Sequence, residues 1–189
     1  MRFNAFMHLR QVRFVGPVGV GKSSAIRAVS DVVRHQTGAV AVVGGVPREV
    51  TEVGEWEAPG GAVISVVAAS EREVPSTARQ GALPRASSTV LWLYGDSRSG
   101  FTEAKRWLDQ LAGQPSTGRL TVAVTRMGPL HHPGYGAAGS KLSLEDVEAL
   151  VWCYDRNVPV LQADPRERAD VVRVLAAAMR GSIGLAETA

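Results

Sequence analysis

The chain has 189 residues, of which 45% are hydrophobic and 21% are charged, and its formal net charge is +3. This length and composition predict one compact globular domain and exclude an intrinsically disordered chain. The 21 basic and 18 acidic residues are interspersed, so no basic block indicates direct binding of nucleic acid.

No apolar run reaches the roughly 18 residues that a membrane-spanning helix needs. Charged residues also interrupt the start of the chain, "MRFNAFMHLRQVRF", so the sequence predicts a cytoplasmic protein without an integral membrane segment. The one cysteine, Cys153, excludes an internal disulfide and a cysteine-based metal site. Its surroundings, "LVWCYDRNV", predict a buried apolar position.

Strand-like and helix-like patterns alternate along the chain, which is typical of an α/β domain. Residues 8–16 are expected to form a strand, and residues 21–35 a helix with one apolar face. Runs of β-branched residues at 39–45 and 61–70 predict two adjacent strands, compatible with an antiparallel pair, and "EAPGG" (57–61) predicts the turn between them.

The next segment, residues 71–88, has little periodicity and is expected to be an exposed, irregular connection. The alternation then becomes regular. Further strands are predicted at 88–96, 119–127 and 158–164, and further helices at 100–113 and 166–181. Ser143, three residues before Asp146, is expected to be the N-cap of one more helix.

Successive parallel strands joined by helices require right-handed crossovers, and they are covered on both faces. We therefore expect a single domain whose core spans about residues 10–181. Its fold is predicted to be a mainly parallel sheet of about six strands with helices on both faces.

A glycine-rich motif follows the first predicted strand and opens the first predicted helix. Residues 16–23, "GPVGVGKS", match the pattern G-x-x-x-x-G-K-[S/T]. In such a loop the backbone N–H groups and the helix N-terminus bind phosphate oxygens, the lysine bridges the β- and γ-phosphates, and the serine hydroxyl ligates Mg²⁺. The expected phosphate-binding residues are Gly16, Pro17, Val18, Gly19, Val20, Gly21, Lys22, Ser23 and Ser24.

Two stretches of the chain resemble the Ras-like small GTPases, and among them the bacterial gliding-motility type and its actinobacterial conservon relatives. These stretches are "VRFVGPVGVGKSSAIRAVSD" (12–31) and "LSLEDVEALVWCYDRNVPVLQADPRERADVVRVLAAAMRG" (142–181). The resemblance implies a three-layer P-loop NTPase fold, GTP or GDP with Mg²⁺ as ligands, and a small roadblock-domain protein as the regulatory partner.

The resemblance also implies which residues lie near the base. In these GTPases the turn after the last strand contacts the base, which would place Ala163 and Asp164 beside it. Thr125 and Arg126 stand at the first two positions of the base-reading motif, Asn/Thr-Lys-x-Asp. Gly128 stands where the aspartate would accept hydrogen bonds from guanine N1 and N2, so guanine preference is not secured.

Thr51 occupies a position similar to the threonine that closes on Mg²⁺ and the γ-phosphate, so Ser23 and Thr51 are the implied metal ligands. The alternative is an ordinary threonine at a strand edge. Where an Asp-x-x-Gly motif should follow residues 62–67, the chain reads "AASER" (68–72), and no glutamine follows there to orient water. We therefore expect slow or absent intrinsic hydrolysis.

Several alternatives remain open. Asp96, which closes "VLWLYGD", is either the Walker B acid of a P-loop ATPase or kinase, or a capping residue at an ordinary strand end. A scaffold that no longer binds nucleotide is the third possibility.

His131 and His132 lack acidic or cysteine neighbours and do not indicate a metal site. Trp56 is either a partner anchor or a core residue, and Trp107 is expected in the core.

Overall fold

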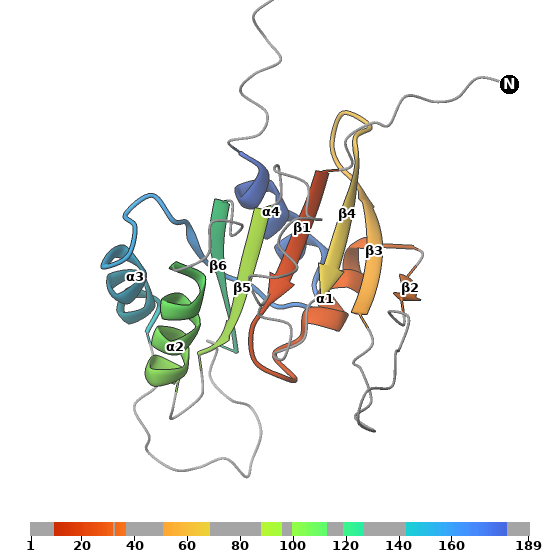
Figure 1. The fold of residues 1–189 in the computed structure, drawn as a ribbon. Helices are drawn as coiled ribbons and strands as arrows, with labels where there is room; N and C mark the ends of the chain where they lie inside the picture. Colours follow the sequence, from red (N-terminus) through yellow and green to blue (C-terminus); the bar gives the residue numbers. More distant parts are fainter. Residues whose placement is uncertain are drawn as a thin grey trace, which may run out of the picture.

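The computed structural model describes residues 10–31, 33–36, 51–68, 88–95, 100–112, 119–126 and 143–180. Within these ranges the chain forms a seven-stranded sheet in the order β2-β3-β4-β1-β5-β6-β7 (Figure 1). The strands are β1 (Arg10–Val15), β2 (Val33–Gln36), β3 (Thr51–Glu57), β4 (Val63–Ala68), β5 (Ser88–Tyr94), β6 (Arg119–Thr125) and β7 (Val160–Gln162). The described helices are α1 (Lys22–Val29), α2 (Gly100–Ala112), α3 (Leu144–Trp152) and α4 (Arg168–Met179).

The sheet is mainly parallel, as the sequence predicts. Strands β4, β1, β5, β6 and β7 are joined by parallel pairs. Only β3 runs against its neighbours, β2 and β4. Among the described residues the sheet has seven strands, where the sequence predicts about six for the chain. β2 forms where the sequence predicts the end of a helix, and β3 forms where the sequence predicts no strand, whereas the predicted strand at 39–45 lies outside the described residues.

Helices cover both faces of the sheet. α1 and α4 pack on one face, where Phe14 and Trp92 meet edge-on with ring centroids 5.7 Å apart. α2 and α3 pack on the other face against Leu91 and Val122 (Figure 1). Since β5 has helices on both sides, its residues from Ser88 to Leu93 are all buried. This two-sided burial explains its continuous apolar run.

The first helix is shorter than its pattern predicts, and the expectation of a helix over residues 21–35 is wrong beyond Val29. The backbone of Ser30 is already extended, with φ −114° and ψ 129°. Val33 then pairs with Gly54 in the antiparallel β2–β3 ladder. β-branched residues favour strands, and here a neighbouring strand is present to pair with them.

Strands β3 and β4 form an antiparallel hairpin around the predicted turn. In this turn the Gly61 N–H donates to the Ala58 carbonyl over 3.0 Å, and the Ala58 N–H donates to the Ala62 carbonyl over 2.9 Å. The antiparallel partner of β4 is therefore residues 51–57. The predicted strand at 39–45 lies outside the described residues.

The capping and core predictions have different outcomes. Ser143 caps α3 with a complete capping box, in which its hydroxyl accepts from the Asp146 N–H, as predicted. Trp56 and Trp107 are core residues, with only 3% and 2% of their surface exposed.

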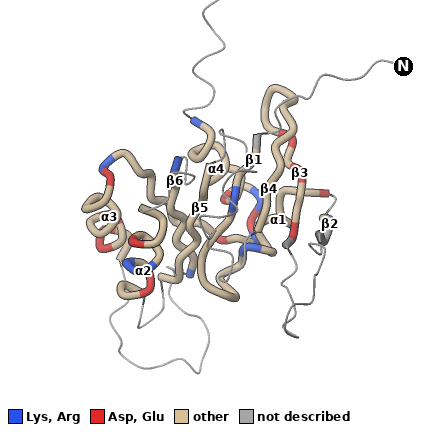
Figure 2. Tube along the Cα trace, in the orientation of Figure 1, with Lys and Arg blue, Asp and Glu red and all other residues tan. Residues whose placement is uncertain are grey.

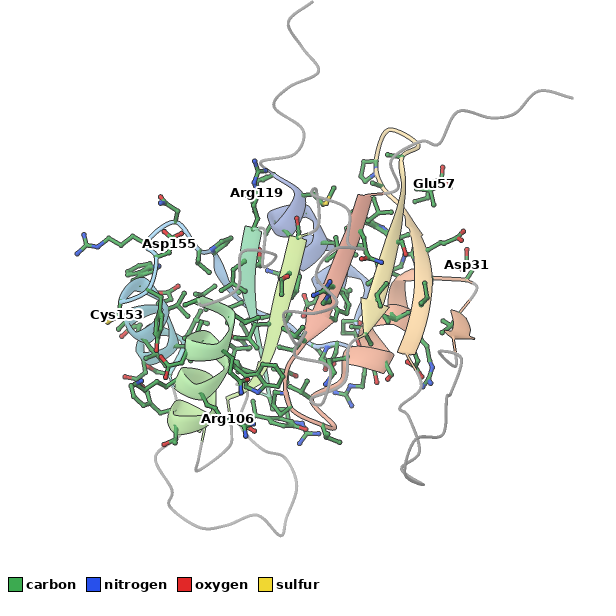
Figure 3. All side chains as sticks on the ribbon, in the orientation of Figure 1. Asp31, Glu57, Arg106, Arg119, Cys153 and Asp155 are labelled. Atoms are coloured by element: carbon green, nitrogen blue, oxygen red, sulfur yellow. The ribbon has the colours of Figure 1, made fainter. Side chains whose placement is uncertain are left out.

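The predicted burial of Cys153 is wrong, since it is exposed at the end of α3 (Figure 3). The buried stripe of that helix consists of Val147, Leu150 and Val151.

Charges of both signs lie together on helix α2. Figure 2 shows basic and acidic residues side by side there, whereas the charged residues of α3 are all acidic. Lys105 donates to Asp109 over 2.8 Å on the exposed side of α2. Among the described residues, no helix has the length and apolar character to cross a bilayer.

Candidate functional site

The direction of the chain connections reverses beside β1. From β1 the chain passes through α1 towards β4, whereas from β5 it passes through α2 towards β6 on the opposite side. In open α/β sheets, ligands bind outside the carboxyl ends of the strands at such a reversal. The glycine-rich loop, residues 16–21, lies at this point because it directly follows β1.

The glycine-rich loop has a backbone that is suited to an anion. Gly16, Gly19 and Gly21 have φ values of +134°, +77° and +103°, a region that residues with side chains rarely adopt. A Cβ on Gly16 would collide with the Trp92 carbonyl of β5. Backbones that alternate in this way direct successive N–H groups into a concave anion-binding nest.

Lys22 lies against this loop. Its Nζ donates to the carbonyls of Gly16 and Pro17 over 2.6 and 2.8 Å. Gly21, the N-cap residue of α1, provides no side-chain cap for the helix, so the first N–H groups of α1 require another acceptor. The loop therefore combines an ammonium group, glycine amides and a helix N-terminus.

Residues after β7 and at the end of β5 contact the glycine-rich loop. A Cβ on Gly21 would collide with Pro165, which follows β7. The Tyr94 hydroxyl, at the end of β5, donates to the Val18 carbonyl over 2.9 Å. Sequence reasoning did not identify Tyr94 or Pro165 as site residues. The signal that could have found them is their position at the carboxyl ends of parallel strands.

The residues expected near the base also come together at this edge. Thr125 is the last residue of β6 and is buried. Arg126 follows in the left-handed conformation, with φ 58°, and its guanidinium carbon lies 5.0 Å from the centre of the Tyr94 ring. Ala163 and Asp164 follow β7, the neighbour of β6 in the sheet.

The backbone amides of Ala163 and Asp164, the two residues expected beside the base, already have acceptors within the protein. The Ala163 N–H donates to the Val124 carbonyl over 3.0 Å. The Asp164 N–H donates to the Asp170 carboxylate over 2.8 Å. The Asp164 carboxylate accepts from Nε and Nη2 of Arg166 over 3.0 and 2.6 Å, and this hydrogen bonding lowers the pKa of Asp164. Asp164 is therefore ionised and held in an ion pair.

The implied metal ligands lie on the same edge of the sheet. Ser23 is in the first turn of α1, and Thr51 is the first residue of β3. Glu52 is paired with Ala68 of β4, which in turn is paired with Phe14 near the end of β1. The start of β3 is therefore level with the beginning of the glycine-rich loop, two strands away.

Other sequence candidates lie outside the described residues: Asp96, Gly128, His131, His132, and residues 69–72 of the missing Asp-x-x-Gly motif. Residues 71–87, the greater part of the predicted irregular connection, also lie outside them. No known protein-family profile matches the chain, and a comparison with curated proteins finds no match.

Proposed function

We propose that this protein is a nucleotide-binding switch or scaffold of the Ras-like small GTPase type. It takes GTP or GDP with Mg²⁺, hydrolyses GTP slowly or not at all, and acts through a regulatory protein partner. The observation that carries this proposal is the glycine-rich loop, with Lys22 folded onto it, at the carboxyl end of a central parallel strand. A roadblock-domain regulator is proposed on the family resemblance alone.

The residues present fit a nucleoside polyphosphate. The glycine amides and the helix N-terminus would bind the phosphate oxygens, and Lys22 would neutralise their charge. The Ser23 hydroxyl, together with Thr51, would hold Mg²⁺, which offsets the charge between the β- and γ-phosphates.

Slow hydrolysis follows from the end of β4. The resemblance requires an acid and a glycine after this strand, but the chain has the buried Ala68 at its end and continues with Ala69 and Ser70. An activator could supply missing groups in trans, as an arginine finger does.

The test is thermal unfolding of the full chain with GTP, GDP, ATP or ADP, each with and without Mg²⁺. Binding at about 100 times the dissociation constant would add about 2.7 kcal/mol to the free energy of unfolding. We expect GTP and GDP to raise the melting temperature, more strongly with Mg²⁺, and Lys22→Ala to abolish the increase.

Lys105→Ala is the matched control, because Lys105 lies on α2 and pairs with Asp109 away from the loop. It should keep the nucleotide-dependent increase. If ATP raised the melting temperature and GTP did not, the ATPase or kinase alternative would replace our proposal. If no nucleotide raised it, the scaffold that no longer binds nucleotide would replace it.

A further inference from the structure

Tyr94 lies between the two parts of the proposed nucleotide site. It is the last residue of β5, the strand between β1 and β6. Its ring packs partly buried against the core formed with α1 and α4. The packing restricts the ring, so both its hydroxyl and its face have defined positions relative to the neighbouring loops.

The hydroxyl of Tyr94 orients one peptide group of the glycine-rich loop. It donates to the Val18 carbonyl over 2.9 Å. In a planar trans peptide the carbonyl and the following N–H point in opposite directions. Holding the Val18 carbonyl on Tyr94 therefore points the Gly19 N–H away from Tyr94.

The same contact requires glycine at the next position. A Cβ on Gly19 would lie 2.9 Å from the Tyr94 hydroxyl, and the φ of Gly19 is +77°. Both the close approach of the Tyr94 hydroxyl and the left-handed backbone therefore favour glycine at position 19. This arrangement leaves the Gly19 amide on the side of the loop that faces away from Tyr94.

The ring of Tyr94 holds Arg126 after the neighbouring strand. Tyr94 and Thr125 are paired in the parallel β5–β6 ladder, and the Gly95 N–H donates to the Thr125 carbonyl over 2.8 Å. Arg126 follows with φ 58°, a conformation that is costly for a residue with a side chain. Its guanidinium carbon lies 5.0 Å from the ring centre, within the range of a cation–π interaction.

We propose that Tyr94 is a positioning residue that joins the phosphate and base parts of the nucleotide site. Its hydroxyl sets the Gly19 amide for the phosphates, and its ring holds the Arg126 side chain where it covers the base. This inference rests on the proposed nucleotide-binding function, and its two halves are separable by substitution.

The experiment measures the affinity of the full chain for GDP and for inorganic tripolyphosphate, which has phosphates but no base, by titration calorimetry. Tyr94→Phe removes the hydroxyl and keeps the ring. We expect it to raise the dissociation constants of both ligands by a similar factor of about three to ten, the effect of one hydrogen bond. Arg126→Met should raise the dissociation constant of GDP and leave that of tripolyphosphate unchanged.

Tyr94→Leu, which removes both the hydroxyl and the ring, should weaken GDP more than tripolyphosphate. If this variant fails to fold, Tyr94→Phe and Arg126→Met still test the two halves separately. A general loss of stability would not produce the difference between the two ligands that we expect for Arg126→Met and Tyr94→Leu. For Tyr94→Phe, a urea unfolding curve that matches the wild type excludes such a loss as the cause of its weaker binding.

Two negative results are distinguishable. In the first, the wild type binds GDP, but Tyr94→Phe binds both ligands as tightly as the wild type, or Arg126→Met weakens the binding of both ligands equally. The proposed role of Tyr94 would then be wrong, and the proposed function would stand. If the wild type bound neither ligand, the proposed function would fail and this inference with it.

Discussion

Gly54 allows helix α1 to approach strand β3 closely. A Cβ at this position would collide with the Ser30 hydroxyl and would lie 2.6 Å from Cγ2 of Ile26. Both of these residues are buried. The contact matters for the site because α1 begins at the glycine-rich loop and β3 begins at Thr51.

We expect Gly54→Ala to lower the free energy of unfolding by about 1–3 kcal/mol, the usual cost of overpacking a core. Urea unfolding measures this change. Ser30→Gly removes the serine atoms nearest the added methyl group, so the double variant should lose less than the sum of the two single changes. Additive losses would show that the collision with Ser30 is not the cause.

At the scale of elements, two carboxylates shape the turn between β7 and α4. Asp170 accepts from the Asp164 N–H and from Nη2 of Arg173 over 2.8 and 2.7 Å. The Asp164 hydrogen bond is the main cause of its lowered pKa, and the Arg173 bond adds to it. The pKa of Asp164 is lowered chiefly by Arg166. This turn carries Pro165, which packs on Gly21, so its shape bears on the glycine-rich loop.

The lowered pKa values predict how stability depends on pH. A carboxyl whose pKa is lower in the folded state stabilises the protein above its unfolded pKa, and this contribution is lost as the pH falls through the folded value. We expect the wild type to lose stability as the pH falls below about 5, through the ordinary carboxyl pKa and on to the lowered folded values, and Asp170→Asn to show a smaller slope there. Urea unfolding at several pH values measures both slopes, and equal slopes would exclude Asp170 as a contributor.

Some boundaries of helices and strands can be predicted from neighbouring residues alone. The capping box of α3 involves only Ser143 and Asp146, three residues apart, so the sequence alone predicts the start of this helix. The end of α1 is different, because β2 forms by pairing with β3. A residue such as Val33 has the same identity in either structure, and its distant partner selects the strand.

At the scale of the whole molecule, the candidate site exists because β1, β5, β6 and β7 end at one edge. Tyr94, Arg126 and Pro165 are far apart in the sequence, yet each lies against another part of this edge. The same arrangement engages the amides of Ala163 and Asp164 within the protein.

This use of the amides predicts weak discrimination between bases. Neither the Ala163 nor the Asp164 N–H remains to bind a base oxygen, and Gly128 provides no carboxylate. We expect GDP to be preferred over ADP by no more than about tenfold in dissociation constant. Direct titration of both nucleotides measures the ratio, and a preference of about a hundredfold or more would show that another group reads the base.

The sequence by itself determined the features that depend on neighbouring residues: the alternation of strands and helices, the motif at residues 16–23 and the cap at Ser143. Only the tertiary structure decided that Val33 lies in a strand, that Trp56 is buried, and that Tyr94 holds both Val18 and Arg126. The physical reason is that a motif or a cap is completed within a few residues. A ladder, a core position or a ring contact is completed only when the fold brings distant segments together.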